Sequence, residues 1–78
     1  MDDGVFPAIV RAAVGVLLVD AAEVTREARL IEDLGATSLS LTEMVIAVEE
    51  DLGISIPEEE MSGLSTIADI ESLVERVR

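Results

Sequence analysis

The chain has 78 residues, half of them hydrophobic, and 17 acids against five basic residues give a net charge of −12. A chain this short forms one small domain and buries only about 60% of its unfolded surface. The negative charge repels nucleic acids and anionic membranes, and it attracts basic protein surfaces. We therefore expect a single domain over residues 1–78, a protein partner, and no binding of nucleic acid or membrane.

The missing residue types argue against an enzyme. The sequence has no cysteine, histidine, tryptophan or tyrosine, and all of its basic residues are arginines. A nucleophilic hydrolase needs a base beside its nucleophile, and His and Lys are the usual ones. Without cysteine there is no disulfide or thiolate metal site, and the acids at 58–60 lack the spacing of a calcium loop. We expect a protein with no catalytic residues and no metal site.

Nothing in the sequence predicts membrane insertion or secretion. The uncharged run that follows Arg11 covers residues 12–19, which is far shorter than the ~20 apolar residues that a bilayer requires. The acidic start Met1-Asp2-Asp3 also lacks the positive charge of a signal peptide. We expect a cytoplasmic protein.

The first predicted element is a helix over about residues 4–18. Asp2 and Asp3 precede it and are placed to cap it and to favour the positive end of its dipole. Its apolar residues recur at helical spacing and predict a buried face. They are Ile9, Val10, Ala13, Val14 and Leu17.

A long loop follows, because residues 20–37 show no long periodic pattern. A connection of this length in a small domain is expected to be functional or pinned. Its apolar residues favour pinning against the core, with one helical turn over residues 30–34. They are Val24, Leu30, Ile31 and Leu34.

The second helix is predicted over residues 38–52 and has two distinct faces. One face is apolar and should join the core: Leu41, Met44, Val45, Val48 and Leu52. The other face sets Leu39 and Ile46 among acids and lies on the same side as Ser38. An apolar centre with an acidic rim indicates a surface that docks on a basic partner.

Ser38 stands where the loop turns into this helix, after the glycine at 35. The first turn of a helix has unpaired N–H groups and the positive end of the dipole, so a hydroxyl there is a good anchor for a phosphate. Thr37 and Ser38 are also good capping residues. From these residues alone, a capping pair without further function remains the alternative.

Two more helices complete the predicted fold. Gly53 ends the second helix, Pro57 opens a short helix over residues 58–62, and the last helix covers residues 66–77. Thr66 and Asp69 have the spacing of a capping box. The inner face of the last helix carries Ile67, Ile70, Leu73, Val74 and Val77. The fold class is all-α: a small bundle of three main helices plus one short helix, with a long loop between the first two main helices.

The sequence resembles the acyl carrier protein family along nearly its whole length. The resemblance rests on Leu30-Ile31-Glu32-Asp33-Leu34-Gly35-Ala36-Thr37-Ser38-Leu39, and it continues through Glu43, Ala47-Val48-Glu49-Glu50, Ile54-Ser55-Ile56-Pro57-Glu58-Glu59 and Thr66-Ile67. In that family the motif serine carries 4′-phosphopantetheine, transferred from coenzyme A by a phosphopantetheinyl transferase. The thiol of this arm holds an acyl chain as a thioester. The resemblance therefore implies that Ser38 is the attachment point.

The resemblance also implies partners and the surface that binds them. Family members dock on their enzymes through the second helix, and the short third helix extends that surface. The matching residues form what we call the docking face: Thr37, Leu39, Glu43, Ile46, Glu49, Glu50 and Glu58. The implied partners of this monomeric carrier are the transferase and acyl ligases, synthases or condensing enzymes with basic patches. Members that shelter the chain between helices use positions matching Val45, Ile56, Met61 and Ile70.

The sequence departs from the family pattern beside the serine. The preceding residue is usually Asp and is Thr37 here, so a carboxylate that family transferases contact is missing. Ser40 and Thr42 also differ from the usual acid and apolar residue. We interpret these changes as an indication of a dedicated pathway, such as polyketide or lipopeptide antibiotic assembly. The alternatives are a carrier of primary fatty-acid synthesis, a peptidyl carrier, and an unmodified acidic helical module that docks on a basic partner.

Overall fold

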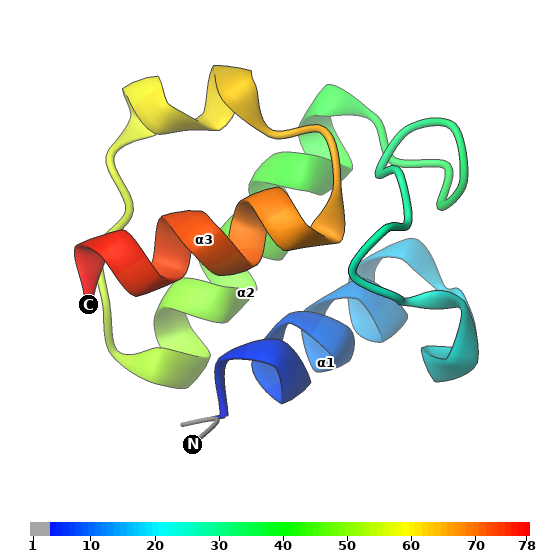
Figure 1. Cartoon of the computed structure of the whole chain (residues 1–78), viewed down its shortest axis with the longest axis horizontal. Helices are drawn as coiled ribbons and strands as arrows, with labels where there is room; N and C mark the ends of the chain where they lie inside the picture. The colour runs from blue at the N-terminus through cyan, green and yellow to red at the C-terminus, as the bar shows by residue number, and fades with distance from the viewer. Residues whose placement is uncertain (1–3) are drawn as a thin grey trace.

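The computed structural model describes residues 4–78 and shows three long helices joined by two short ones (Figure 1). The α-helices are α1 (Val5–Leu17), α2 (Ser38–Leu52) and α3 (Ile67–Val77), and the 3-10 helices are η1 (Ala21–Glu23) and η2 (Glu58–Gly63). The described residues contain no β-strand and no helix long and apolar enough to cross a membrane. The prediction of an all-α bundle with a long loop between its first two main helices is confirmed. The short helix η1 was not expected.

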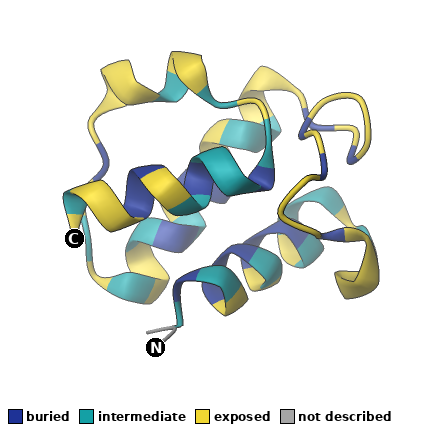
Figure 2. Cartoon of the chain, viewed as in Figure 1, coloured by how far each residue is buried: buried dark blue, intermediate teal, exposed yellow. Residues whose placement is uncertain are grey.

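The core is aliphatic and is built from one face of each long helix and from the loop between α1 and α2 (Figure 2). Its largest side chains are at most 1% exposed: Ile9, Leu30, Met44, Ile67, Ile70 and Leu73. On α2, Met44, Val45 and Val48 are buried as expected. The other two predicted core residues of α2 are half-buried and pack against the core, and they are Leu41 and Leu52.

The predicted inner face of α1 was partly wrong. The structure buries Val5, Ala8, Ile9, Ala12 and Ala13. Of the other predicted residues, Val10 and Leu17 are half-buried and pack against the core, whereas Val14 is half-buried and does not. The helix is apolar on most sides, so its periodicity defines a face poorly, and its alanines allow close packing with α2. The capping predicted for Asp2 and Asp3 lies outside the described residues.

The connection between α1 and α2 is pinned to the start of α3. The N–H of Leu30 donates to the carbonyl of Ser65 at 2.8 Å, and the N–H of Ile67 donates to that of Ala28 at 3.1 Å. The expectation of a pinned loop is therefore confirmed, and the buried side chains that accompany these bonds are Val24, Ala28, Leu30, Leu34 and Ala36. Ile31 was expected to be pinned as well, but its side chain is 63% exposed.

Arg26 adds a side-chain anchor to this connection. Its guanidinium donates two hydrogen bonds to the carboxylate of Glu71 on α3, at 2.8 and 3.1 Å. The same group lies 4.3 Å from the centre of the Phe6 ring on α1, within the range of a cation–π contact. One side chain thus joins the loop to two helices.

The capping box predicted at the start of α3 is confirmed. The N–H of Asp69 donates to Thr66 Oγ1 at 3.2 Å, and the N–H of Thr66 donates to Asp69 Oδ2 at 3.1 Å. The N–H of Ser65 also donates to Asp69 Oδ2, at 2.9 Å. These N–H donors, Ser65 first, lower the pKa of Asp69 because they stabilise its charged form.

The end of α1 holds a strained residue. Leu18 follows the helix in the left-handed conformation, with φ 59° and ψ 38°, and its N–H donates to the carbonyl of Val14. A side chain with a Cβ costs about 1–2 kcal/mol in this conformation, and glycine is the usual residue there. The Leu18 side chain is 85% exposed, so burial gives little compensation.

We predict that Leu18→Gly stabilises the protein, because glycine adopts this conformation without strain. The expected gain is about 1 kcal/mol, which raises the melting temperature by about 4–8 °C in a domain of this size. Thermal unfolding followed by circular dichroism measures it. Leu18→Ala is the matched control, since it removes the exposed side chain and keeps the strain. A Gly variant no more stable than the Ala variant would contradict this explanation.

Candidate functional site

Ser38 is the first residue of α2, at the point where the pinned connection enters the helix (Figure 1). Its side chain is exposed. Within residues 4–78 its hydroxyl makes no hydrogen bond, and the N–H groups of Ser38 and Leu39 have no acceptor either. The site therefore presents a free hydroxyl beside free N–H donors at the positive end of a helix of 15 residues.

A tight turn aims the chain at this position. The N–H of Gly35 donates to the carbonyl of Ile31 at 3.2 Å, and the N–H of Ala36 donates to that of Leu30 at 2.8 Å. Gly35 has φ 73°, which only glycine adopts without strain. Leu34 and Ala36 are buried on either side of it. The glycine thus reverses the chain between two buried anchors, and Ser38 emerges at the surface.

A capping box holds the start of α2 without using Ser38. The N–H of Ser40 donates to Thr37 Oγ1 at 3.2 Å, and the N–H of Thr37 donates to Ser40 Oγ at 2.7 Å. Thr37 therefore keeps the capping role expected of it. The reciprocal role of Ser40 was missed by the sequence analysis, although a Thr three residues before a Ser resembles the capping-box spacing, which usually ends in Glu or Gln.

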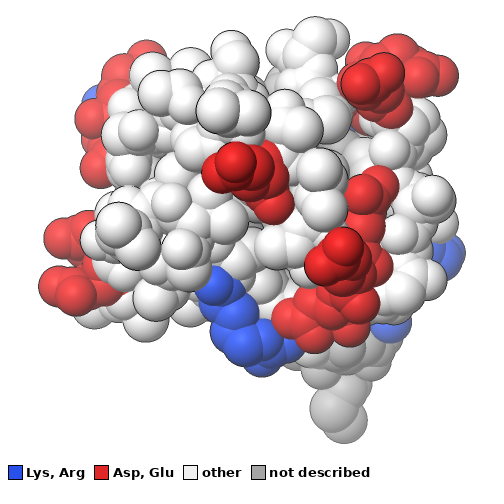
Figure 3. All heavy atoms as spheres, turned by 180° about the vertical axis from the view of Figure 1, so that it is seen from behind, with Lys and Arg blue, Asp and Glu red and all other residues white. Residues whose placement is uncertain are grey.

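The outward side of α2 carries apolar residues and uncommitted acids. Leu39 is 70% exposed and Ile46 is 46% exposed, as the sequence predicted. Glu43 and Glu50 are exposed and form no ion pair or hydrogen bond within the described part of the chain. Figure 3 shows the molecule from behind, with several groups of acids and few basic side chains on that face.

Glu49 differs from the other acids expected at the docking face. Its Oε2 accepts a hydrogen bond from the backbone N–H of Ile56 at 2.6 Å, and its side chain is only partly exposed. The carboxylate thus joins α2 to the linker over residues 53–57. This structural role was not predicted, because a contact across the turn at Gly53 leaves no periodic signal in the sequence.

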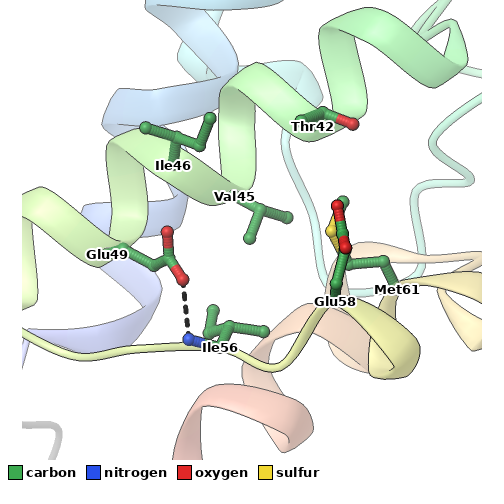
Figure 4. Close-up of a pocket in the computed structure, with 7 residues that line it drawn as sticks. All are labelled: Thr42, Val45, Ile46, Glu49, Ile56, Glu58 and Met61. Atoms are coloured by element: carbon green, nitrogen blue, oxygen red, sulfur yellow. Dashed lines mark hydrogen bonds between the residues drawn. The ribbon is translucent and has the colours of Figure 1, made fainter.

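A hollow lies between α2 and η2 (Figure 4). We call it the α2–η2 hollow; its volume is about 240 Å³, and it is lined by Thr42, Val45, Ile46, Glu49, Ile56, Glu58 and Met61. Three of the four residues proposed for an acyl pocket line it together: Val45, Ile56 and Met61. The fourth, Ile70, is fully buried in the core and does not line the hollow.

Thr42 connects the hollow to Ser38. Its Oγ1 donates a hydrogen bond to the carbonyl oxygen of Ser38 at 3.0 Å, so the hollow begins one helical turn from the free hydroxyl. Among residues 4–78, no group of acids is arranged to hold a metal ion.

Comparison with known proteins gives the family. The family described as "Phosphopantetheine attachment site" matches residues 7–74. An acyl carrier protein of Helicobacter hepaticus is 43% identical over 70 residues, which cover 90% of this chain and 92% of that protein. The chain belongs to the acyl carrier protein family.

Two further relatives give the same result. An acyl carrier protein of Solidesulfovibrio magneticus is 43% identical over 58 residues, which are 74% of each chain. One from Akkermansia muciniphila is 43% identical over 60 residues, covering 77% of this chain and 75% of that protein. Acyl carrier proteins are non-catalytic carriers with covalently bound 4′-phosphopantetheine, and they interact with a phosphopantetheinyl transferase and with biosynthetic enzymes. The same therefore holds for this chain.

We predict that Ser40→Ala destabilises the protein, because it leaves the N–H of Thr37 without its acceptor. The expected loss in the free energy of unfolding is about 1 kcal/mol, measured by urea denaturation. Ser72→Ala is the control: this exposed serine on α3 makes no hydrogen bond within the described residues, so its removal should not lower the stability. Equal stabilities of the two variants would show that Ser40 does not hold the helix start.

Proposed function

We propose that Ser38 Oγ is the atom to which 4′-phosphopantetheine is attached. The supporting observation is the exposed hydroxyl that takes no part in the capping of its own helix. The residues present fit the group, because a phosphate on Ser38 faces the free N–H donors and the positive dipole of the first turn of α2. On the same proposal, residues 1–78 form one monomeric carrier domain that works in the cytoplasm.

The attachment reaction needs little from this chain. Ser38 Oγ forms a bond to the phosphorus next to the pantetheine of coenzyme A, the pyrophosphate bond breaks, and 3′,5′-adenosine bisphosphate leaves. The transferase accepts the hydroxyl proton, since the chain has no histidine or lysine to serve as a base. The bound arm supplies the thiol that holds an acyl group as a thioester. The task of this chain is to expose Ser38 and to bind its partners.

The docking face is our proposed surface for these partners. Leu39 and Ile46 supply exposed apolar contacts, and Glu43, Glu50 and Glu58 surround them with negative charge. An apolar centre with such a rim suits a transferase, ligase, synthase or condensing enzyme that carries arginines and lysines around an apolar pocket. Thr37 lies at the same end, next to Ser38.

We further propose that the carrier serves a specialised pathway, such as polyketide or lipopeptide antibiotic assembly. Thr37 and Ser40 support this, because together they form a neutral cap where carboxylates are usual in the family. A transferase that recognises its carrier by contacts with those carboxylates would bind this chain weakly. A carrier of primary fatty-acid synthesis and a peptidyl carrier are the alternatives within the family.

We predict that the wild-type protein, incubated with coenzyme A and a promiscuous phosphopantetheinyl transferase, gains the mass of one 4′-phosphopantetheine. Ser38→Ala should gain nothing, because it lacks the acceptor oxygen, whereas Ser40→Ala should still be modified. Mass spectrometry of the intact proteins measures the gain in mass of the wild type and of both variants. No gain by the wild type with several transferases would favour the unmodified helical module.

We also predict that Glu43→Lys and Glu50→Lys each slow this modification by about tenfold at low salt, because charge attraction accelerates association with a basic partner. The difference should shrink as salt rises. Glu75→Lys is the matched control, since it makes the same charge change at an exposed position on α3. If all three variants react equally fast, α2 is not the docking surface.

A further inference from the structure

The wall of the α2–η2 hollow opposite α2 is formed by the linker over residues 53–57 and by η2 (Figure 4). The linker leaves α2 through Gly53, which has φ 67°. Ile56 packs in the core, and two polar side-chain contacts also tie this segment to the long helices. One is the hydrogen bond from the N–H of Ile56 to Glu49, and the other is an exposed ion pair between Glu60 and Arg76 at 3.1 Å.

The bond of Glu49 is the stronger of these two contacts. A carboxylate that accepts an N–H forms a charge-assisted hydrogen bond, and its length of 2.6 Å is short for this type. Exposed ion pairs such as Glu60–Arg76 contribute little. Glu49 also accepts the N–H of Ile54 on its backbone carbonyl, at 3.1 Å. One residue of α2 therefore fixes the linker at two points.

We propose that Glu49 is a positioning residue that holds the linker over residues 53–57 against α2. This hydrogen bond, which we call the latch, determines how well the α2–η2 hollow shelters an acyl chain on the Ser38 arm from water. This inference rests on the proposed function, because the chain arrives through that arm. Ile56 bears the bonded N–H and also lines the hollow beside Val45. Release of the bond frees this wall, and water then reaches the chain.

The size of the hollow indicates which chains depend on the latch. Its volume of about 240 Å³ holds about eight groups the size of a water molecule or a methylene. An apolar chain of about eight carbons therefore fills it, whereas an acetyl group is too short to benefit. The two acids that line it, Glu49 and Glu58, favour a chain without negative charge.

The first part of the test uses the unmodified protein. Amide hydrogen exchange of Ile56 is compared by NMR between the wild type, Glu49→Ala and Glu49→Gln. The control is Glu59→Ala, which removes a nearby exposed acid that does not line the hollow. We expect Glu49→Ala to speed this exchange at least tenfold and Glu49→Gln to speed it less, because the amide oxygen still accepts. Exchange at Met44 and Leu73 should stay slow.

The second part uses the same proteins loaded at Ser38 with octanoyl and acetyl arms. Attack of hydroxylamine on the thioester is followed by mass spectrometry. We expect the octanoyl form of the wild type to react several-fold more slowly than the acetyl form, and Glu49→Ala to remove this difference. Glu59→Ala should retain it. Glu49→Gln should lie between the two.

The outcomes separate the latch from the function on which it rests. The latch is contradicted if the amide of Ile56 exchanges at the same rate in all variants. It is also contradicted if hydroxylamine attacks the octanoyl and acetyl forms of the wild type at the same rate. If Glu49→Ala also speeds the amide exchange of Met44 and Leu73, the variant has lost its fold. The comparison of Glu49→Gln with the wild type then tests the latch by itself. If no arm can be attached, the proposed function fails, while the exchange measurement still shows whether Glu49 holds the linker.

Discussion

The short backbone ladder between the α1–α2 connection and the start of α3 is the contact on which the rest of the structure depends. In this ladder the N–H of Leu30 donates to the carbonyl of Ser65, and the N–H of Ile67 donates to the carbonyl of Ala28. The ladder brings the buried part of the loop into a core that three helices alone would leave incomplete. With the loop fixed, Gly35 turns the chain outward. Ser38 then begins α2 in solvent, not against a neighbouring helix.

The ion pairs of the described residues use acids that lie outside the proposed docking face. Four arginines form ion pairs with acids of this chain: Arg11 with Asp51, Arg26 with Glu71, Arg29 with Asp33, and Arg76 with Glu60. Glu49 is held by a backbone N–H. Of the acids that we assign to the docking face, Glu43, Glu50 and Glu58 remain without an ion pair or hydrogen bond within the described residues. The acids that pair within the chain are therefore different residues from the exposed acids of the proposed docking face.

The sequence predicted what local chemistry and helical period determine. Spacing along a helix was enough to predict the capping box of Thr66 and Asp69, the end of α2 at Gly53, and the exposed apolar residues Leu39 and Ile46. It failed where the deciding contact is tertiary or where the pattern is degenerate. Ile31 is as apolar as Leu30, and only the ladder to α3 decides which of the two is buried. The apolar sides of α1 did not identify its inner face, and the hydrogen bond of Glu49 spans a turn.

Attachment of the arm to the oxygen of Ser38, as proposed above, can be tested by mapping the modified residue. The wild-type protein is loaded with 4′-phosphopantetheine, digested, and sequenced by tandem mass spectrometry. We expect the added mass on Ser38 alone. The same mass on Ser40, on Thr42 or on any residue outside the first turn of α2 would contradict it.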